Sequence, residues 1–182
     1  MIHKIMIVCA VLLSAFALYA QKPVSAAVTD IEDDPSNGLE MCRSLFNEYF
    51  LSELTTHAKV MMLDTASIQK SMTDLKLTRG RDLSKKEIKE LCAKLKTDAL
   101  CLVKMSGGKG NAIVIKVKIV DNQGKMAGTV SASMKGIGET DATSHSMARE
   151  SAVILRKIRG IDEVKMPKEK SGNQLPDTVT AI

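Results

Sequence analysis

The chain has 182 residues, 45% of them hydrophobic and only 3% aromatic, which is enough for one domain with a core and too short for two to be expected. Its 26 basic and 21 acidic residues give a formal net charge of +5. This mild excess lacks the dense basic surface of a nucleic-acid-binding protein, so no nucleic-acid partner is expected.

Residues 1–20, MIHKIMIVCAVLLSAFALYA, have the features of a secretory signal peptide. Lys4 precedes an apolar run that ends in small residues, which is the order that such signals share. We expect cleavage after Ala20, with Ala17 as a second candidate. The alternative is a retained membrane anchor, but no basic residue closes the run on its far side. The mature protein is then periplasmic, spans no membrane and carries a net charge of +4, because the signal contains one basic residue and no acidic one.

The cysteines predict buried free thiols. Cleavage leaves Cys42, Cys92 and Cys101, and an odd number cannot form a complete disulfide framework. Each lies at an apolar position of its segment, where a reduced, buried side chain is expected; a Cys92–Cys101 bridge is the alternative. Lipid attachment at Cys9 is rejected because Val8, directly before it, is not a small residue.

The first half of the mature chain predicts strand, helix, strand, helix, helix. The corresponding ranges are 24–31, 39–54, 58–64, 65–75 and 84–98. Apolar residues recur at helical spacing in the three helices. Asp64 or Thr65 is a natural cap for the second helix. Ser84 and Glu87 form a capping box at the start of the third.

The pattern then changes to a period of two over 99–105, 111–121 and 125–136, followed by a helix over about 143–159. One side of the last strand carries Met126, Val130, Ala132 and Met134, and the apolar stripe of the helix consists of Met147, Ile154 and Ile158. The turn DNQG joins the last two strands, and its Gly124 is expected to take a positive φ. This order predicts an α/β fold, with a mixed β-sheet, a C-terminal antiparallel meander and helices packed mainly on one face. Residues 21–164 form the single domain, and residues 165–182 are expected to be a disordered tail.

The loop SGGKGN (106–111) invites comparison with a phosphate-binding loop. Such a loop leads from a strand into a helix, whose N-terminus faces the anion. Here the following segment alternates like a strand, so we expect a hairpin turn instead.

The remaining chemistry-bearing residues predict no catalytic or metal site. His57 and His145 are expected to be solvated, because no base–nucleophile spacing or metal-ligand spacing surrounds them. Four acidic residues near the first strand lack the spaced ligands of a calcium loop, so we expect a solvated turn. These residues are Asp30, Glu32, Asp33 and Asp34.

One sheet face is the candidate partner-binding surface. Ile113, Ile115, Val117 and Ile119 point to the face that the helices cover. The opposite face then presents two lysines beside short polar side chains, a flat strip that can receive a partner. The predicted binding residues are Lys116, Lys118, Thr129, Ser131 and Ser133.

The chain over about 24–158 resembles a group of bacterial envelope domains. The resemblance is carried by AAVTDIEDD, by AKVMMLDTASIQKSM, by LCAKLKTDALCLVKMSG through Asp98, and by VIKVKIVDNQGKMAGTVSASMKG through Asp121 and Gly124. The group includes the curli-secretion protein CsgG, the penicillin-binding-protein activator LpoB, the flagellar outer-membrane protein FlgO and the N-terminal domain of TolB. The resemblance implies a non-enzymatic protein that assembles, docks or activates. The lipid-carrying cysteine and the long membrane-spanning hairpins of pore-forming relatives are missing, so a pore is not expected.

We therefore expect an exported accessory or interaction protein of a flagellar, secretion or cell-wall assembly, with no enzymatic activity and no cofactor. Two alternatives stay open. One is a binding protein for an anionic glycan or lipid head group that uses Lys104, Lys109, Lys116 and Lys118. The other is an envelope hydrolase that uses His145 with a neighbouring serine.

Overall fold

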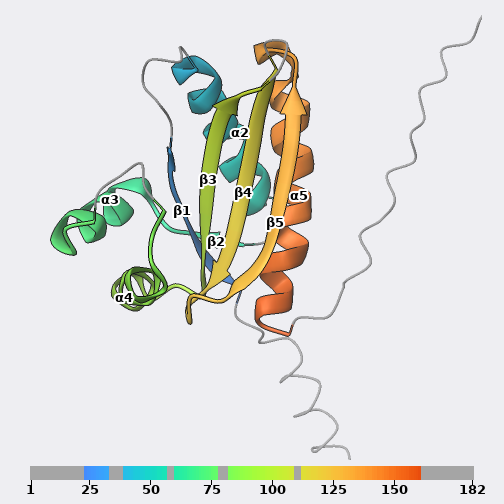
Figure 1. The fold of residues 1–182 in the computed structure, drawn as a ribbon. Helices are drawn as coiled ribbons and strands as arrows, with labels where there is room; N and C mark the ends of the chain where they lie inside the picture. Colours follow the sequence, from blue (N-terminus) through green and yellow to red (C-terminus); the bar gives the residue numbers. More distant parts are fainter. Residues whose placement is uncertain (1–22, 33–38, 57–59, 78–81, 109–111, 161–182) are drawn as a thin grey trace, which may run out of the picture.

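A five-stranded sheet carries helices on both faces in the computed structural model, which describes residues 23–32, 39–56, 60–77, 82–108 and 112–160 (Figure 1). In chain order the elements are β1 (Ser25–Glu32), α2 (Glu40–Thr56), β2 (Met61–Met62), α3 (Thr65–Asp74), α4 (Lys85–Leu95), β3 (Ala99–Gly107), β4 (Ile113–Asp121), β5 (Met126–Met134), a short 3-10 turn η3 (Ile137–Glu139) and α5 (Thr140–Ile158). The predicted order of strands and helices and the predicted α/β class are both confirmed.

The sheet has the strand order β2-β1-β3-β4-β5. β1 is parallel to β2 and β3, whereas β3, β4 and β5 form an antiparallel meander, so the predicted mixed sheet is confirmed. SGGKGN joins the two antiparallel strands β3 and β4, as a hairpin requires, although its residues 109–111 lie outside the described part of the chain. Gly124 has a φ of 69°, as predicted for the β4–β5 turn.

β2 is shorter than the strand predicted over 58–64. It pairs with β1 at two positions only. Two residues later Asp64 already caps α3, accepting a hydrogen bond from the Ser67 amide at 2.8 Å. The apolar run is therefore used partly as strand and partly as the approach to a helix.

The two long helices, α2 and α5, cover one face of the sheet (Figure 1). The core there contains the apolar side chains of β4 that were predicted to face the helices, and the stacked rings of Phe46 and Phe50 from α2. The two short helices, α3 and α4, pack on the other face against Ala27, Leu100 and Val120. Only the part of that second face nearest β1 and β3 is covered in this way.

Two predicted apolar faces differ from the observed ones. The buried face of α5 centres on small residues such as Ala148 and Ala152, so α5 approaches α2 and the sheet closely, while Ile154 and Ile158 lie at its margin. Met126 was expected beside Val130 in the core but is 51% exposed. A register shift between Ile119 and Val120 of β4 separates Met126 from the regular β4–β5 ladder.

The start of α5 was predicted three residues late. Glu139 occupies the N-cap position and makes no side-chain capping bond, because its carboxylate accepts a hydrogen bond from the Lys135 amide at 2.8 Å. η3 leads directly into the helix, so the usual capping signal is missing at this end. The capping box of Ser84 and Glu87 on α4 is confirmed, with both reciprocal bonds formed.

Asp98 connects three parts of the chain at the end of the sheet where β3 begins. One carboxylate oxygen accepts hydrogen bonds from the Ser25 amide and hydroxyl, each at 2.9 Å, and the other accepts one from Arg159 at 2.9 Å. Burial by itself would raise the pKa of Asp98, but the bonds from Ser25 and Arg159 outweigh it and hold the pKa below its ordinary value. Asp98 therefore ties β1 and the end of α5 to the start of β3.

Cys42, Cys92 and Cys101 are buried free thiols, as predicted. Burial raises the pKa of Cys101 to about 12. Burial, with a smaller contribution from Asp121 and Asp98, raises the pKa of Cys92 to about 11. The Cys92–Cys101 bridge, the alternative considered above, is not formed.

Candidate functional site

All five residues of the predicted partner-binding surface lie on the sheet face opposite α2 and α5. Lys116 and Lys118 belong to β4, and Thr129, Ser131 and Ser133 belong to β5. In the register of the two strands, Lys116 lies opposite Ser131, and Lys118 lies opposite Thr129. Together with Lys104 on β3, these residues form what we call the open sheet face.

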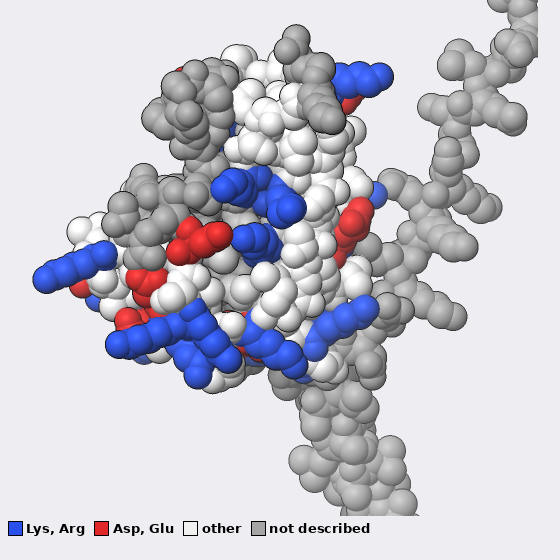
Figure 2. Space-filling model, in the orientation of Figure 1, with Lys and Arg blue, Asp and Glu red and all other residues white. Residues whose placement is uncertain are grey.

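The open sheet face is exposed because α3 and α4 cover only the neighbouring part of the same side of the sheet, near β1 and β3. Leu100, Leu102 and Val120 lie beneath or beside these helices, whereas Thr129, Ser131 and Ser133 are exposed. Figure 2 shows basic side chains near the middle of this face and an uncharged surface beside them over β5. These residues form a strip on the sheet surface rather than the walls of a cleft.

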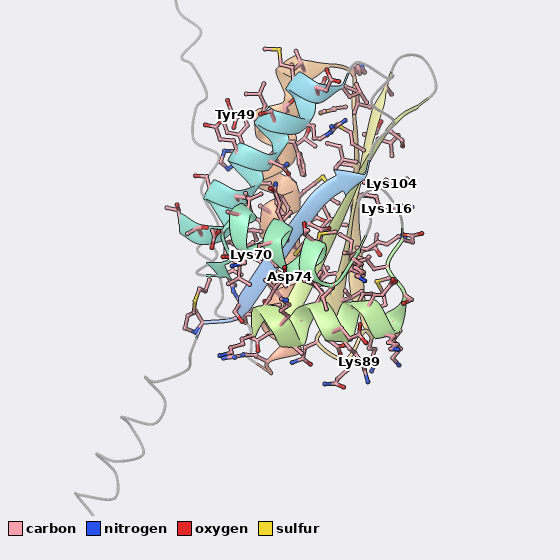
Figure 3. All side chains as sticks on the ribbon, turned by 90° about the vertical axis from the view of Figure 1, so that its left-hand side faces the viewer. Tyr49, Lys70, Asp74, Lys89, Lys104 and Lys116 are labelled. Carbon is pink, nitrogen blue, oxygen red and sulfur yellow. The ribbon has the colours of Figure 1, made fainter. Side chains whose placement is uncertain are left out.

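The lysines of the open sheet face have different surroundings. The Lys118 ammonium group donates a hydrogen bond to Asp82 at 3.0 Å, and this bond holds the pKa of Asp82 below its ordinary value. Lys116 is exposed and lies directly opposite Lys104 in the β3–β4 register. Both extend on the same side of the sheet in Figure 3. The last lysine of the predicted anion site, Lys109, lies outside the described residues.

Like charges placed opposite each other on neighbouring strands repel and destabilise a sheet. Lys104 and Lys116 are such a pair and concentrate positive charge at one place on the surface, while the charge of Lys104 also helps to lower the pKa of Asp82. This place suits a carboxylate, phosphate or sulfate group of a partner or ligand.

A second polar cluster joins α2 to α5 on the other side of the sheet. Glu53 is only 1% exposed. One of its carboxylate oxygens lies 2.6 Å from Nδ1 of His145, and the other accepts a hydrogen bond from Nε of Arg149 at 2.8 Å. Nε2 of His145 lies 2.9 Å from Asp141, and the ring stacks beside Tyr49 at a centroid distance of 6.2 Å. The cluster links two helices by charge as well as by apolar packing.

The expectation that His145 is solvated is wrong in its detail, because its side chain is 37% exposed and contacts two carboxylates. Nor does the structure bring a neighbouring serine to it. Ser144 donates its hydroxyl hydrogen to the Thr140 carbonyl oxygen at 2.6 Å, and Ser146 is exposed. Since a nucleophilic serine must hydrogen-bond to its base, this geometry gives the hydrolase alternative no serine–histidine pair. His57 lies outside the described residues.

Sequence reasoning missed Glu53, although the sequence carries a signal for it. Glu53 lies three positions after Phe50 and seven after Phe46, so it continues the apolar face of α2. A charged residue on an otherwise apolar helix face needs a partner when it is buried. That partner comes from α5, about ninety residues later, and no local pattern identifies it.

Among the described residues, no group of three or more His, Cys, Asp and Glu side chains is placed to hold a metal ion. Of the four acidic residues weighed as a calcium site, Asp33 and Asp34 lie outside the described residues, as do the side chains of Asp30 and Glu32. In the same described part, no helix has the length and apolar character needed to cross a bilayer. The predicted signal peptide and tail also lie outside the described residues.

No protein-family model matches the chain, and no curated protein matches it. Among solved structures, the C-terminal domain of LpoB from Escherichia coli aligns with a TM-score of 0.50 at 12% identity, covering 62% of this chain and 83% of that one. The C-terminal domain of LpoB from Salmonella enterica gives a TM-score of 0.46 at 14% identity, covering 67% and 92%. A lipoprotein from Neisseria meningitidis gives 0.47 at 16% identity, covering 76% and 98%.

At these identities the similarity concerns the fold alone. The chain has an LpoB-like fold, and the predicted resemblance is confirmed in that respect. The likeness to CsgG, FlgO and TolB stays a prediction.

Proposed function

We propose that this chain is a non-enzymatic accessory protein of a bacterial cell-envelope assembly, which works in the periplasm by docking a protein partner on its open sheet face. Flagellar, secretion and cell-wall machinery are the candidate assemblies. The LpoB-like fold supports this class, since the resemblance stated above implies proteins that dock or activate rather than catalyse. The export signal predicted over 1–20 supports the compartment.

The observation that carries the proposal is the position of Lys116. It lies between Lys104 on one neighbouring strand and Ser131 on the other. A like-charge pair at this place costs stability, and exposed small residues beside it leave room for a partner. Solubility alone does not require two lysines at directly opposite positions, whereas docking of an acidic partner gives such a pair a function.

Affinity purification from the native envelope tests the proposal. The tagged chain, gently crosslinked before extraction, is compared with Lys116→Glu and with Lys89→Glu, which makes the same charge change at an exposed position of α4. We expect one reproducible envelope protein with the unmodified chain and with Lys89→Glu, and at least a tenfold loss with Lys116→Glu. Recovery of no reproducible partner, or equal recovery with both variants, would count against docking on this face.

The lysine pair also favours a second candidate, a binding protein for an anionic glycan or lipid head group. The salt dependence of binding, measured with vesicles containing anionic lipid and with a sulfated glycan, distinguishes this candidate from protein docking. Exposed charges are screened over about 10 Å at 0.1 M ionic strength, so such binding should fall steeply with salt. Binding that does not change between low and high salt would remove this candidate.

A further inference from the structure

β5 is an edge strand, and it lacks the usual protection of an edge. Within the described residues it has a strand neighbour on one side only, β4. Its nine residues, MAGTVSASM, include no charged residue and no proline. Natural sheets normally shorten, charge, bend or cover such edges, because an exposed edge can pair with another chain. The opposite edge, β2, is protected by its length of two residues.

The alternation of backbone hydrogen bonds along β3, β4 and β5 shows which backbone groups of β5 point away from β4. Gly108 donates to the Ala112 carbonyl at 2.6 Å, and Asn122 donates to the Asp98 carbonyl at 2.9 Å. These two bonds lie at opposite ends of the β3–β4 ladder and share its register. Since bonding direction alternates along an antiparallel strand, the even-numbered residues of β4 bond to β3 and the odd-numbered ones bond to β5.

The β4–β5 register pairs odd-numbered residues of β4 with even-numbered residues of β5, for example Val117 with Val130. The even-numbered residues of β5 are therefore those that bond to β4. The N–H and C=O groups of Thr129, Ser131 and Ser133 point away from β4, toward the edge. These are the same three residues whose side chains lie on the open sheet face.

The side chains beside this edge select the charge of an added strand. Lys116 lies opposite Ser131, and Lys118 lies opposite Thr129. Lys118 is already bonded to Asp82, whereas Lys116 is exposed, and because Ser131 is short the Lys116 side chain can extend over it toward a strand placed beyond β5. A second copy of this chain would bring a β5 without acidic residues and a net positive charge, so charge complementarity favours an acidic partner instead.

We infer that the β5 edge receives an extended acidic segment of a partner protein, which adds to the sheet as a sixth strand through the backbone of Thr129, Ser131 and Ser133. Acidic side chains at alternate positions of that segment would lie on the face of Lys116, since side chains alternate between the faces of a strand. Of the large exposed apolar side chains in the described part of the chain, Met126 and Ile137 lie at the two ends of β5 and can contact apolar residues flanking the segment. This inference rests on the proposed function and names the kind of partner that the surface fits.

Two synthetic nine-residue peptides test the inference on the full chain by fluorescence anisotropy. Both alternate charged residues with valine and threonine; one carries glutamate at the charged positions and the other carries lysine. We expect the acidic peptide to bind at least tenfold more tightly than the basic one. In Lys116→Glu this preference should be lost.

Two variants separate backbone pairing from side-chain contact. Ser131→Pro removes an N–H that points away from β4, so the β4–β5 ladder should survive, and we expect at least a tenfold loss of acidic-peptide binding. Ser131→Ala keeps the N–H and should bind like the unmodified chain. Equal binding by Ser131→Pro and Ser131→Ala would overturn strand addition, as would no binding of the acidic peptide at millimolar concentration.

Amide hydrogen exchange gives a readout that needs no variant. In the free chain the amides of Thr129, Ser131 and Ser133 should exchange quickly, and the acidic peptide should slow their exchange. The amides of Val130 and Ala132 should be protected in both states. Protection of the first three at high protein concentration without peptide, together with dimer formation, would assign the edge to a second copy and overturn the inference. If the peptide tests fail while envelope capture remains sensitive to Lys116→Glu, strand addition is wrong and the proposed docking function stands.

Discussion

Asp98 joins three parts of the fold through a single side chain. Its carboxylate accepts two bonds from Ser25 and one from Arg159, so one side chain restrains the first strand and the last helix. The resemblance to envelope domains drew attention to Asp98 as part of the segment LCAKLKTDALCLVKMSG. The spacing of residues in that segment gave no indication of the distant hydrogen-bond donors.

Replacing Asp98 with alanine should lower the free energy of unfolding by about 1–2 kcal/mol, because hydrogen bonds to a charged group are lost and their donors are left without this acceptor. Chemical denaturation measures the loss. Asp74→Asn, which weakens an exposed ion pair between α3 and Lys94 of α4, should cost less than about 1 kcal/mol, since exposed ion pairs contribute little. An Asp98→Ala chain as stable as Asp74→Asn would contradict the assigned role.

The same carboxylate predicts a pH dependence. The pKa of Asp98 is lower in the folded chain than its unfolded value of about 3.9, so its stabilising contribution is complete well above pH 4 and declines as the pH falls through the folded pKa. The stability difference between the unmodified chain and Asp98→Asn should therefore shrink as the pH is lowered from about 6 to about 3. A difference that stays constant over this range would show that the charge is unimportant.

The buried cysteines predict slow thiol chemistry. Cys92 and Cys101 are at most 1% exposed, and their raised pKa values leave almost no thiolate at neutral pH. In a chain carrying Cys9→Ser, an aromatic disulfide reagent should label no cysteine quickly at pH 8 and should label three after denaturation. Rapid labelling in native conditions would show that the core around β3 opens readily.

At the scale of elements, the contact between α2 and α5 depends on a charged cluster as well as on apolar packing. Glu53 is buried between His145 and Arg149. We expect Glu53→Gln to cost about 1–3 kcal/mol of unfolding free energy, since a charged acceptor of two bonds is lost from a buried position. Glu48→Gln, at an exposed position of the same helix, should stay within about 0.5 kcal/mol of the unmodified chain in thermal or chemical denaturation. Equal effects would mean that the cluster is incidental.

Local patterns predicted the elements well where one physical signal dominates. The capping box of Ser84 and Glu87 identified α4, and the alternation from Ile113 to Ile119 identified β4 with its correct buried face. Prediction was poorer where tertiary contacts decide. The start of α5 carries no side-chain cap, and Met126 is exposed beside a register shift that no local pattern reveals.

At the scale of the whole molecule, the sequence predicted the sheet class and the face on which the five candidate residues lie, but it did not predict that α3 and α4 pack on that second face. α3 and α4 share only short apolar rows with β1 and β3, and their packing on the second face follows from the position of β1 inside the sheet. That position also makes β5 an edge. The open sheet face is thus a consequence of topology, although its residues were visible in the sequence.

The central claim is that a protein partner contacts the open sheet face along β5, and site-specific photo-crosslinking in the native envelope tests it most directly. A photoreactive residue replaces Ser131 in one chain and Glu90, an exposed residue of α4, in another. We predict a crosslinked protein of defined mass from position 131 and none from position 90. The same adduct from both positions, or an adduct from position 90 alone, would contradict the account.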